Sequence, residues 1–278
     1  MLMKNRDDWL EILVCCKDNV RACIKPYLKN LGQPQPDLGK GAGGDPMKPV
    51  DLAAEKAIVE ILEQYEVSYT LISEESGVKE FGETPRMFYV TVDPIDGTTN
   101  LVRGLPFYAS SIAVSSAPVF SSVFAGLVAD LVHDATYSAL EGKGAFRDFE
   151  RITSSKESSL GDAVLGLDLN TYRIKSIASH LTELIEKTRH IRHFGANALE
   201  LCYVADGSTE GFIDIRGKLR PTDVAAGLFI LREAGGTVTT NTGEEFDVRL
   251  DPTKKIKFIA SGNKQIHEKI LSLVNSKC

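Results

Sequence analysis

The segment that most constrains this chain is a buried strand that runs directly into two acidic residues. Residues 87–92 are apolar, aromatic or β-branched, as in a strand inside a sheet. The sequence Asp93-Pro94-Ile95-Asp96-Gly97-Thr98-Thr99-Asn100 follows. Its two carboxylates would project into the crevice where α/β sheets bind ligands. Gly97 permits a tight turn. The residues after Gly97 can start a helix whose first backbone N–H groups are free. Carboxylates beside N–H donors favour a site where hard cations and a phosphate group meet.

The remaining pattern predicts a mixed α/β chain in two parts. In the first half we expect helices over 7–30 and 51–65 (with Asp51 as the N-cap of the second), strands over 69–73, 87–92, 110–115 and 123–129, and a hairpin over 135–147. A polar, serine-rich connection at 153–162 predicts a boundary between an α+β domain of residues 1–155 and an α/β domain of residues 156–278. In the second half we expect strands over 163–168, 190–194, 211–215, 236–240 and 257–261, and helices over 176–189, 196–206, 221–234 and 263–275.

Composition narrows the class of protein. The 278 residues are 43% apolar and 25% charged, which is typical of a globular protein with a sizeable core. A net charge of −6 argues against binding nucleic acid through a general basic surface, and no apolar run approaches the ~18 residues of a membrane span. The five cysteines lack C-x-x-C spacing, and residues 1–9 are unlike a signal peptide. We therefore expect a reduced, cytoplasmic protein.

Acidic residues fall at four places: Asp51, Glu74-Glu75, Asp93 with Asp96, and Asp223. Taken singly, each has an ordinary explanation, such as a helix first turn, a solvated surface pair or an Asp-Gly turn. Taken together, carboxylates at the ends of several elements suit a site for two or more Mg²⁺ ions. Two such ions about 4 Å apart could activate a water and stabilise the leaving oxygen of a phosphate ester.

These blocks resemble the inositol monophosphatase family, in particular its archaeal branch, whose members often also hydrolyse fructose 1,6-bisphosphate. The resemblance rests on Ser73-Glu74-Glu75-Ser76, the Asp93–Asn100 block, Phe194-Gly195-Ala196-Asn197-Ala198-Leu199, Ala205-Asp206-Gly207 and Thr222-Asp223-Val224-Ala225-Ala226-Gly227. The blocks run in family order from Asp51 to about Gly236. The resemblance implies a layered αβαβα fold and a Mg²⁺-dependent phosphatase acting on small phosphorylated polyols or sugars.

The resemblance also implies ligands for two to three Mg²⁺ ions. Glu74, Asp93 and the carbonyl of Ile95 would bind the first ion, and Asp93, Asp96 and Asp223 the second. A third, weakly held ion would be bound mainly through Glu74 and water.

Further roles follow from the same resemblance. Thr98 paired with Asp51 would orient and deprotonate the attacking water. Glu75 would support catalysis by contacting the residues that bind the metal ions rather than the ions themselves. The backbone N–H groups of Gly97 and Thr98 would hold the phosphate. Contacts to the substrate hydroxyls are implied for Gly195, Ala196 and Asp214. The resemblance also implies a homodimer and inhibition by Li⁺.

Three other segments carry open interpretations. The glycine-rich segment 39–44 lacks the strand and helix of a dinucleotide-binding motif, and we expect it to close over the metal site as a mobile loop. The basic run Arg216, Lys218 and Arg220 is either a solvated turn or an attractor of anionic substrate. Arg173, with Lys175, could bind a distal phosphate group.

Two alternative functions remain open at this point. One is a nucleotide phosphatase acting on 3′-phosphoadenosine 5′-phosphate or NADP. The other is a non-catalytic regulatory scaffold that retains the metal site, although the pairing of Thr98 with Asp51 argues against lost catalysis.

Overall fold

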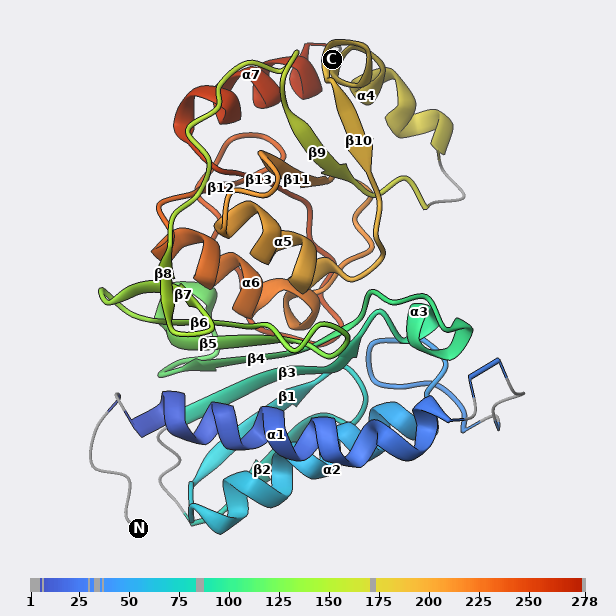
Figure 1. Cartoon of the computed structure of the whole chain (residues 1–278), viewed down its shortest axis with the longest axis vertical. Helices are drawn as coiled ribbons and strands as arrows, with labels where there is room; N and C mark the ends of the chain where they lie inside the picture. Colours follow the sequence, from blue (N-terminus) through green and yellow to red (C-terminus); the bar gives the residue numbers. More distant parts are fainter. Residues whose placement is uncertain are drawn as a thin grey trace.

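Helices and sheets alternate in layers through the molecule, so that two helices cover one sheet, two more separate it from a second sheet, and two cover the far side (Figure 1). The computed structural model describes residues 6, 8–29, 31–32, 36, 38–83, 88–170 and 174–276. This is the αβαβα arrangement expected from the sequence, and it confirms the fold class.

The first sheet has the strand order β2-β1-β3-β4-β5-β6-β7-β8. Only β1 and β3 pair in parallel, and the other neighbours are antiparallel. Its strands are β1 (Tyr69–Ser73), β2 (Gly77–Phe81), β3 (Phe88–Asp96), β4 (Ala109–Ser115), β5 (Val123–Asp130), β6 (Thr136–Leu140), β7 (Gly144–Arg147) and β8 (Glu150–Ile152). Two short helices, α3 (Thr98–Arg103) and the 3₁₀ turn η1 (Phe120–Ser122), connect strands at its ends.

Two helices, α1 (Asp8–Leu28) and α2 (Pro49–Gln64), cover the outer face of this sheet. The buried residues of α1 recur at helical spacing, which gives the helix one apolar face: Trp9, Ile12, Leu13, Cys16, Val20 and Ile24. The Trp9 ring packs edge-on against Phe88 of β3 with 5.2 Å between ring centroids. This aromatic contact fixes the helix on the sheet.

The inner face of the first sheet packs against α5 (Asn197–Ala205) and α6 (Pro221–Glu233). Residues 221–231 of α6 are all buried, because this helix has the first sheet on one side and α5 and the second sheet on the other. A helix that is apolar all round is expected only where it is covered on every side. Gly227 lets α6 approach α5 closely, since a Cβ there would lie 2.9 Å from the Ala198 carbonyl oxygen.

The second sheet has the order β10-β9-β11-β13-β12, with β9 parallel to both of its neighbours. Its strands are β9 (Val164–Leu167), β10 (His190–Arg192), β11 (Gly211–Asp214), β12 (Thr237–Thr240) and β13 (Phe258–Ser261). The amphipathic helices α4 (Ile174–Lys187) and α7 (Lys264–Asn275) pack together and close the outer side.

The sequence-based elements are confirmed in type and order, with three differences. Asp51 is not the N-cap of α2: the helix begins at Pro49 with Lys48 as N-cap, which places Asp51 at the third helical position. Strand β3 continues through the acidic block to Asp96. The edge strands β2 and β8 were not expected. The chain crosses from the first sheet to the second between residues 152 and 164, and the domain boundary within that stretch stays a prediction.

Two expectations from composition bear on the fold. Cys15, Cys16, Cys23 and Cys202 are free thiols, and Cys278 lies outside the described residues. Within the described part of the chain, no helix combines the length and apolarity needed to cross a membrane.

Candidate active site

Two parallel strands bring the first pair of acidic side chains together. In the parallel β1–β3 register, Ser73 lies opposite Val92. The next residues along the two strands, Glu74 and Asp93, therefore lie side by side toward the carboxyl end of this strand pair. The Glu74 N–H donates to the Val92 carbonyl at 3.4 Å, which continues the pairing one step beyond β1. Glu74 follows the end of β1 as predicted, whereas Asp93 lies within β3, which continues to Asp96.

A bulge in β3 turns the acidic block out of the regular sheet. Asp93 pairs with Ser111 and Asp96 with Ala109, so β3 has one residue more than β4 across this stretch. Pro94 lies within it and has no N–H to offer the ladder, which is the situation in which a strand bulges.

Asp223 reaches the same place from the start of α6. Pro221 is the first residue of the helix, and Asp223 at the third position accepts a 2.8 Å hydrogen bond from the Arg220 backbone N–H. This reciprocal cap orients the carboxylate at the positive end of the helix dipole.

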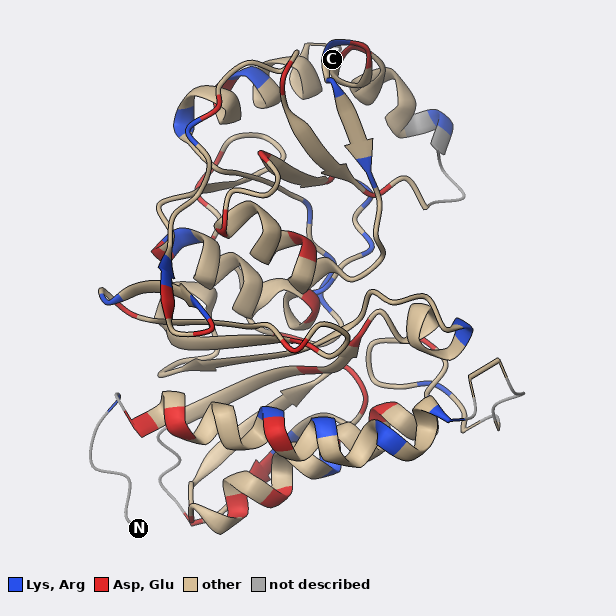
Figure 2. Ribbon diagram, viewed as in Figure 1, with Lys and Arg blue, Asp and Glu red and all other residues tan. Residues whose placement is uncertain are grey.

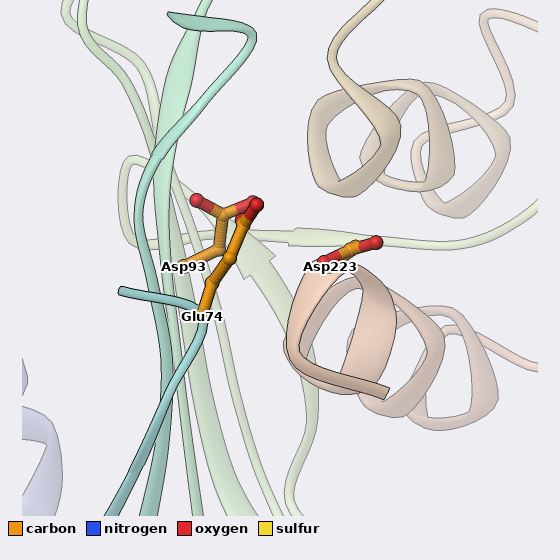
Figure 3. Close-up of side chains that lie close together, drawn as sticks. All are labelled: Glu74, Asp93 and Asp223. Carbon is orange, nitrogen blue, oxygen red and sulfur yellow. The ribbon is translucent and has the colours of Figure 1, made fainter. Parts of the chain in front are cut away.

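Glu74, Asp93 and Asp223 form a cluster in which one carboxylate oxygen of each lies within 4.8 Å of the others (Figure 3). Burial raises the pKa of Glu74 to about 8, with the charge of Asp223 adding to the effect. Burial, followed by the charge of Glu74, also holds the pKa of Asp93 well above its usual range. Three carboxylates this close repel one another unless a cation lies among them.

The donor set fits a hard divalent cation. Every side-chain atom that the cluster offers is a carboxylate oxygen, which Mg²⁺ prefers. The neighbouring Glu75 has a buried Oε2 without a hydrogen-bond partner among the described residues, and its pKa is raised to about 7, first by burial and then by Asp51. Glu75 lines the same cleft, and its supporting role stays a prediction.

Thr98 and Asp51 form the expected pair. Thr98 Oγ1 lies 2.9 Å from Asp51 Oδ1 and 2.9 Å from the carbonyl oxygen of Ile95, and its single proton can serve only one of them at a time. Burial raises the pKa of Asp51 to about 6, while its hydrogen bonds from Thr98 and Lys48 oppose the rise. The Thr98 hydroxyl is thus hydrogen-bonded to a carboxylate, Asp51, whose pKa lies near neutral pH.

Asp96 is placed differently from the other predicted ligands. Its carboxylate accepts hydrogen bonds from the backbone N–H groups of Asn197 at 3.0 Å and Ala198 at 2.7 Å, so it caps α5 from the first sheet. Burial raises its pKa to about 7, against these two bonds. Asp96 lines the same cleft but is not part of the three-carboxylate cluster, and its role as a ligand stays a prediction.

The segment before α5 contacts the turn that precedes α3. A Cβ at Gly97 would lie 3.1 Å from the Ala196 Cβ and 3.1 Å from the Gly195 carbonyl oxygen. Glu200 holds this segment by accepting the Gly195 N–H at 3.0 Å. Gly97 and Gly195 line the cleft, whereas Ala196 is buried beneath them.

The predicted substrate residue Asp214 does not reach the cleft surface. It is fully buried, and its carboxylate accepts hydrogen bonds from the backbone and guanidinium of Arg216. Arg216 also pairs with Asp168, and these two residues line the cleft in front of Asp214. Arg216 belongs to the basic run that was considered as an attractor of anionic substrate, whereas Asp168 was not a candidate, because its pairing with Arg216 joins residues 48 positions apart.

Arg220 also has a role that the sequence did not reveal. Its side chain is only 7% exposed and pairs with Asp223, Glu74 and Asp45, so the solvated-turn interpretation of the basic run is wrong for this residue. The sequence does contain a sign of this role. Arg220 immediately precedes Pro221 and lies three residues before Asp223, so as the N-cap residue of the helix it can pair with that carboxylate.

A cleft of about 780 Å³ connects these groups. Its lining includes Asp45 and Pro46, which follow the glycine-rich segment 39–44, and the Gly43 N–H of that segment donates to the Glu74 carbonyl oxygen at 2.8 Å. The segment therefore contacts Glu74, while its mobility and its closure over the metal site stay predictions. Arg173 lies outside the described residues, and Lys175 is exposed on α4. Figure 2 shows acidic and basic residues together near the ends of α5 and α6 that face α3.

Comparison with known proteins identifies the family. The sequence profile described as "Inositol monophosphatase family" matches residues 7–277. The chain belongs to this family. The "Fructose-1,6-bisphosphatase/inositol-1-monophosphatase" of Methanothermobacter thermautotrophicus is 37% identical to this chain over 274 residues, which cover 95% of each protein.

Two further relatives extend the comparison. The "Bifunctional NADP phosphatase/NAD kinase" of Methanococcus maripaludis is 32% identical over 290 residues, covering 97% of this chain and 50% of that protein. A crystal structure of an inositol monophosphatase-fructose 1,6 bisphosphatase superposes with a TM-score of 0.83 at 28% identity, covering 98% of this chain and all of that one. The layered architecture is therefore that of the inositol monophosphatase family.

Proposed function

We propose that this member of the inositol monophosphatase family is a Mg²⁺-dependent phosphatase that hydrolyses sugar or polyol phosphate monoesters, inositol 1-phosphate and fructose 1,6-bisphosphate in particular. The observation that carries this proposal is the cluster of Glu74, Asp93 and Asp223, with oxygens within 4.8 Å, in the same cleft as the 2.9 Å pair of Thr98 and Asp51. Membership of the family and the names of the relatives support it.

The residues of the site divide the chemistry between them. Mg²⁺ held by the carboxylates would supply positive charge that lowers the pKa of a bound water and offsets the charge on the phosphoryl oxygens. Thr98 Oγ1 would accept a hydrogen bond from the attacking water while donating its own proton to Asp51 Oδ1. As the water oxygen bonds to phosphorus, Thr98 would take a proton from the water and pass its own to Asp51, for which a pKa of about 6 is well matched near neutral pH. The bond from phosphorus to the ester oxygen would break, and that oxygen would leave as the substrate hydroxyl after taking a proton from water.

Substrate binding is assigned to the turn and loop beside this pair. The backbone N–H groups of Gly97 and Thr98, at the start of α3, would hold the phosphate, and Gly195 would contact a substrate hydroxyl. In place of the buried Asp214, we assign polar contacts with the substrate to Asp168 and Arg216, because these two residues line the cleft.

A second candidate activity is NADP phosphatase. The relative that carries this activity in its name matches 97% of this chain. A second cavity of about 590 Å³ shares Arg216, Gly217 and Lys255 with the cleft and adds Lys254 and Lys257. These basic residues favour a substrate with a further anionic group beyond the scissile phosphate, as in a bisphosphate or a dinucleotide.

Initial rates of phosphate release with Mg²⁺ test these alternatives. Inositol 1-phosphate, fructose 1,6-bisphosphate, 3′-phosphoadenosine 5′-phosphate and NADP are assayed in parallel, with Asp93→Asn as the blank and LiCl as an inhibitor arm. The proposal predicts release from the first two substrates, inhibition by Li⁺ and loss of at least about 10²-fold in Asp93→Asn.

Three other outcomes would change the assignment. Release from the nucleotides alone would overturn the sugar and polyol assignment and favour the second candidate. Release that persists in Asp93→Asn would contradict the catalytic role of the cluster. Mg²⁺ binding without release from any of the four would favour a regulatory scaffold.

A further inference from the structure

Arg220 places its guanidinium group among the carboxylates of the candidate metal site. Its Nη2 lies 2.6 Å from Glu74 Oε1 and its Nε lies 3.0 Å from Asp223 Oδ1. These are two of the three carboxylates of the cluster. An arginine side chain is always protonated in proteins, so the guanidinium brings a permanent positive charge to these carboxylates.

The third nitrogen of the same guanidinium holds the glycine-rich loop. Arg220 Nη1 donates to the Gly43 carbonyl oxygen at 2.9 Å and to Asp45 Oδ2 at 2.8 Å. The fit is tight, because a Cβ at Gly43 would lie 2.2 Å from Nη1. One side chain therefore joins the cluster, through Glu74 and Asp223, to the loop that lies over it.

We propose that Arg220 is a built-in counter-cation that competes with the divalent metal for Glu74 and Asp223, so that metal entry displaces its guanidinium and loosens the loop at Gly43 and Asp45. This rests on the proposed function insofar as the cluster binds Mg²⁺. The physical reason is that a guanidinium and a divalent ion on the same carboxylates, a few ångströms apart, repel each other with little solvent between them.

Arg216 provides a matched comparison within the same segment. Its side chain is 4% exposed and bridges two carboxylates, Asp168 and Asp214, as Arg220 does. Neither of those carboxylates belongs to the cluster. Replacing Arg216 therefore removes the same charge from the same cleft without removing a competitor for the metal ligands.

The test is Mg²⁺ affinity measured by isothermal titration calorimetry on the full chain, at a pH of about 8 after removal of metal with a chelator. Arg220→Met keeps an unbranched side chain in place of the aliphatic part of arginine and removes the charged guanidinium, and we expect the dissociation constant to fall about tenfold, which corresponds to about 1.4 kcal/mol. Gly43→Ala keeps all charges but pushes Nη1 away, and we expect a smaller fall of about threefold. Arg216→Met should leave the constant within about twofold of the wild-type value.

Equal or weaker Mg²⁺ binding by folded Arg220→Met would overturn the competition while leaving the proposed function intact. If wild-type protein binds no Mg²⁺ at millimolar concentration, the proposed function and this inference both fall. Should Arg220→Met fail to fold, the competition is tested in the wild-type protein by the NMR chemical shift of Arg220 ¹⁵Nε. This resonance is assigned by comparison with Gly43→Ala. The proposal predicts that the resonance moves on saturation with Mg²⁺, and an unchanged resonance contradicts it.

Discussion

At the scale of single residues, the site works through burial. Glu74, Asp93 and Asp51 are each held where water solvates their charge poorly, and burial raises the pKa of each. Such a cost is tolerated at functional sites, where perturbed carboxyl groups are expected to bind cations or move protons. Thr98 is half-buried beside them, and its proton has two acceptors at 2.9 Å, the Asp51 carboxylate and the Ile95 carbonyl oxygen.

The pairing of Thr98 with Asp51 is tested by removing one hydroxyl. Thr98→Val keeps the shape of the side chain, and we expect kcat to fall about 10²- to 10⁴-fold because the attacking water loses its orienting group. Mg²⁺ affinity should stay within about twofold, since Thr98 is not in the carboxylate cluster. Thr98→Ser, which restores the hydroxyl, should recover most of kcat. A Thr98→Val enzyme with near wild-type kcat would refute the role of the pair.

At the scale of elements, the main α/β pattern was readable in the sequence but the long-range pairing was not. The buried strand before Asp93 and the helix after Pro221 are local signals, and both are confirmed. The edge strand β2 (Gly77–Phe81) was missed because three of its five residues are exposed and two are charged, so no buried alternation marks it. The N-cap of α2 differs from the prediction because the helix begins at Pro49, a residue that is favoured at the first helical position but is equally common in loops.

The turn that joins β3 to α3 is fixed by close packing as well as by backbone conformation. Gly97 has φ of 86°, and an added Cβ would meet Ala196, Gly195 and Phe107 at 3.1 Å. Gly142 has a similar φ of 71° with nothing within 4 Å. Gly142→Ala should therefore cost about 1 kcal/mol in unfolding free energy, and Gly97→Ala about 2 kcal/mol or more. If urea unfolding gives equal losses of unfolding free energy for the two variants, crowding at Gly97 contributes nothing to the cost of its substitution.

At the scale of the whole molecule, the site is assembled from both halves of the chain. Glu74 and Asp93 come from the first sheet, whereas Asp223 and Arg220 come from the start of α6, about 130 residues later. No local sequence pattern specifies the contact between Arg220 and Glu74, because it depends on how α6 packs on the sheet. The resemblance to the family predicted the acidic residues, and the burial of Asp214 behind Arg216 emerged only from the structure.

This assembly makes stability depend on pH. A carboxyl group whose pKa is raised in the folded protein holds a proton that the unfolded chain releases at lower pH. Folding is then favoured at low pH and loses stability as pH rises through the folded pKa, which is about 6 for Asp51, about 7 for Glu75 and about 8 for Glu74. Mg²⁺ binding requires the ionised groups and should reverse the loss.

The most direct test of the central claim, that the buried carboxylates form a Mg²⁺ site, is the thermal unfolding midpoint at pH 5.5 and at pH 8, with chelator or with Mg²⁺. We predict that the midpoint of the chelated protein falls by about 5 °C or more between the two pH values, and that Mg²⁺ raises it much more at pH 8 than at pH 5.5. Asp93→Asn should lose the Mg²⁺ effect. Asp130→Asn, which alters a buried carboxylate that binds His133 instead, should keep it. A Mg²⁺ effect that is absent in the wild type, or unchanged in Asp93→Asn, would contradict the account.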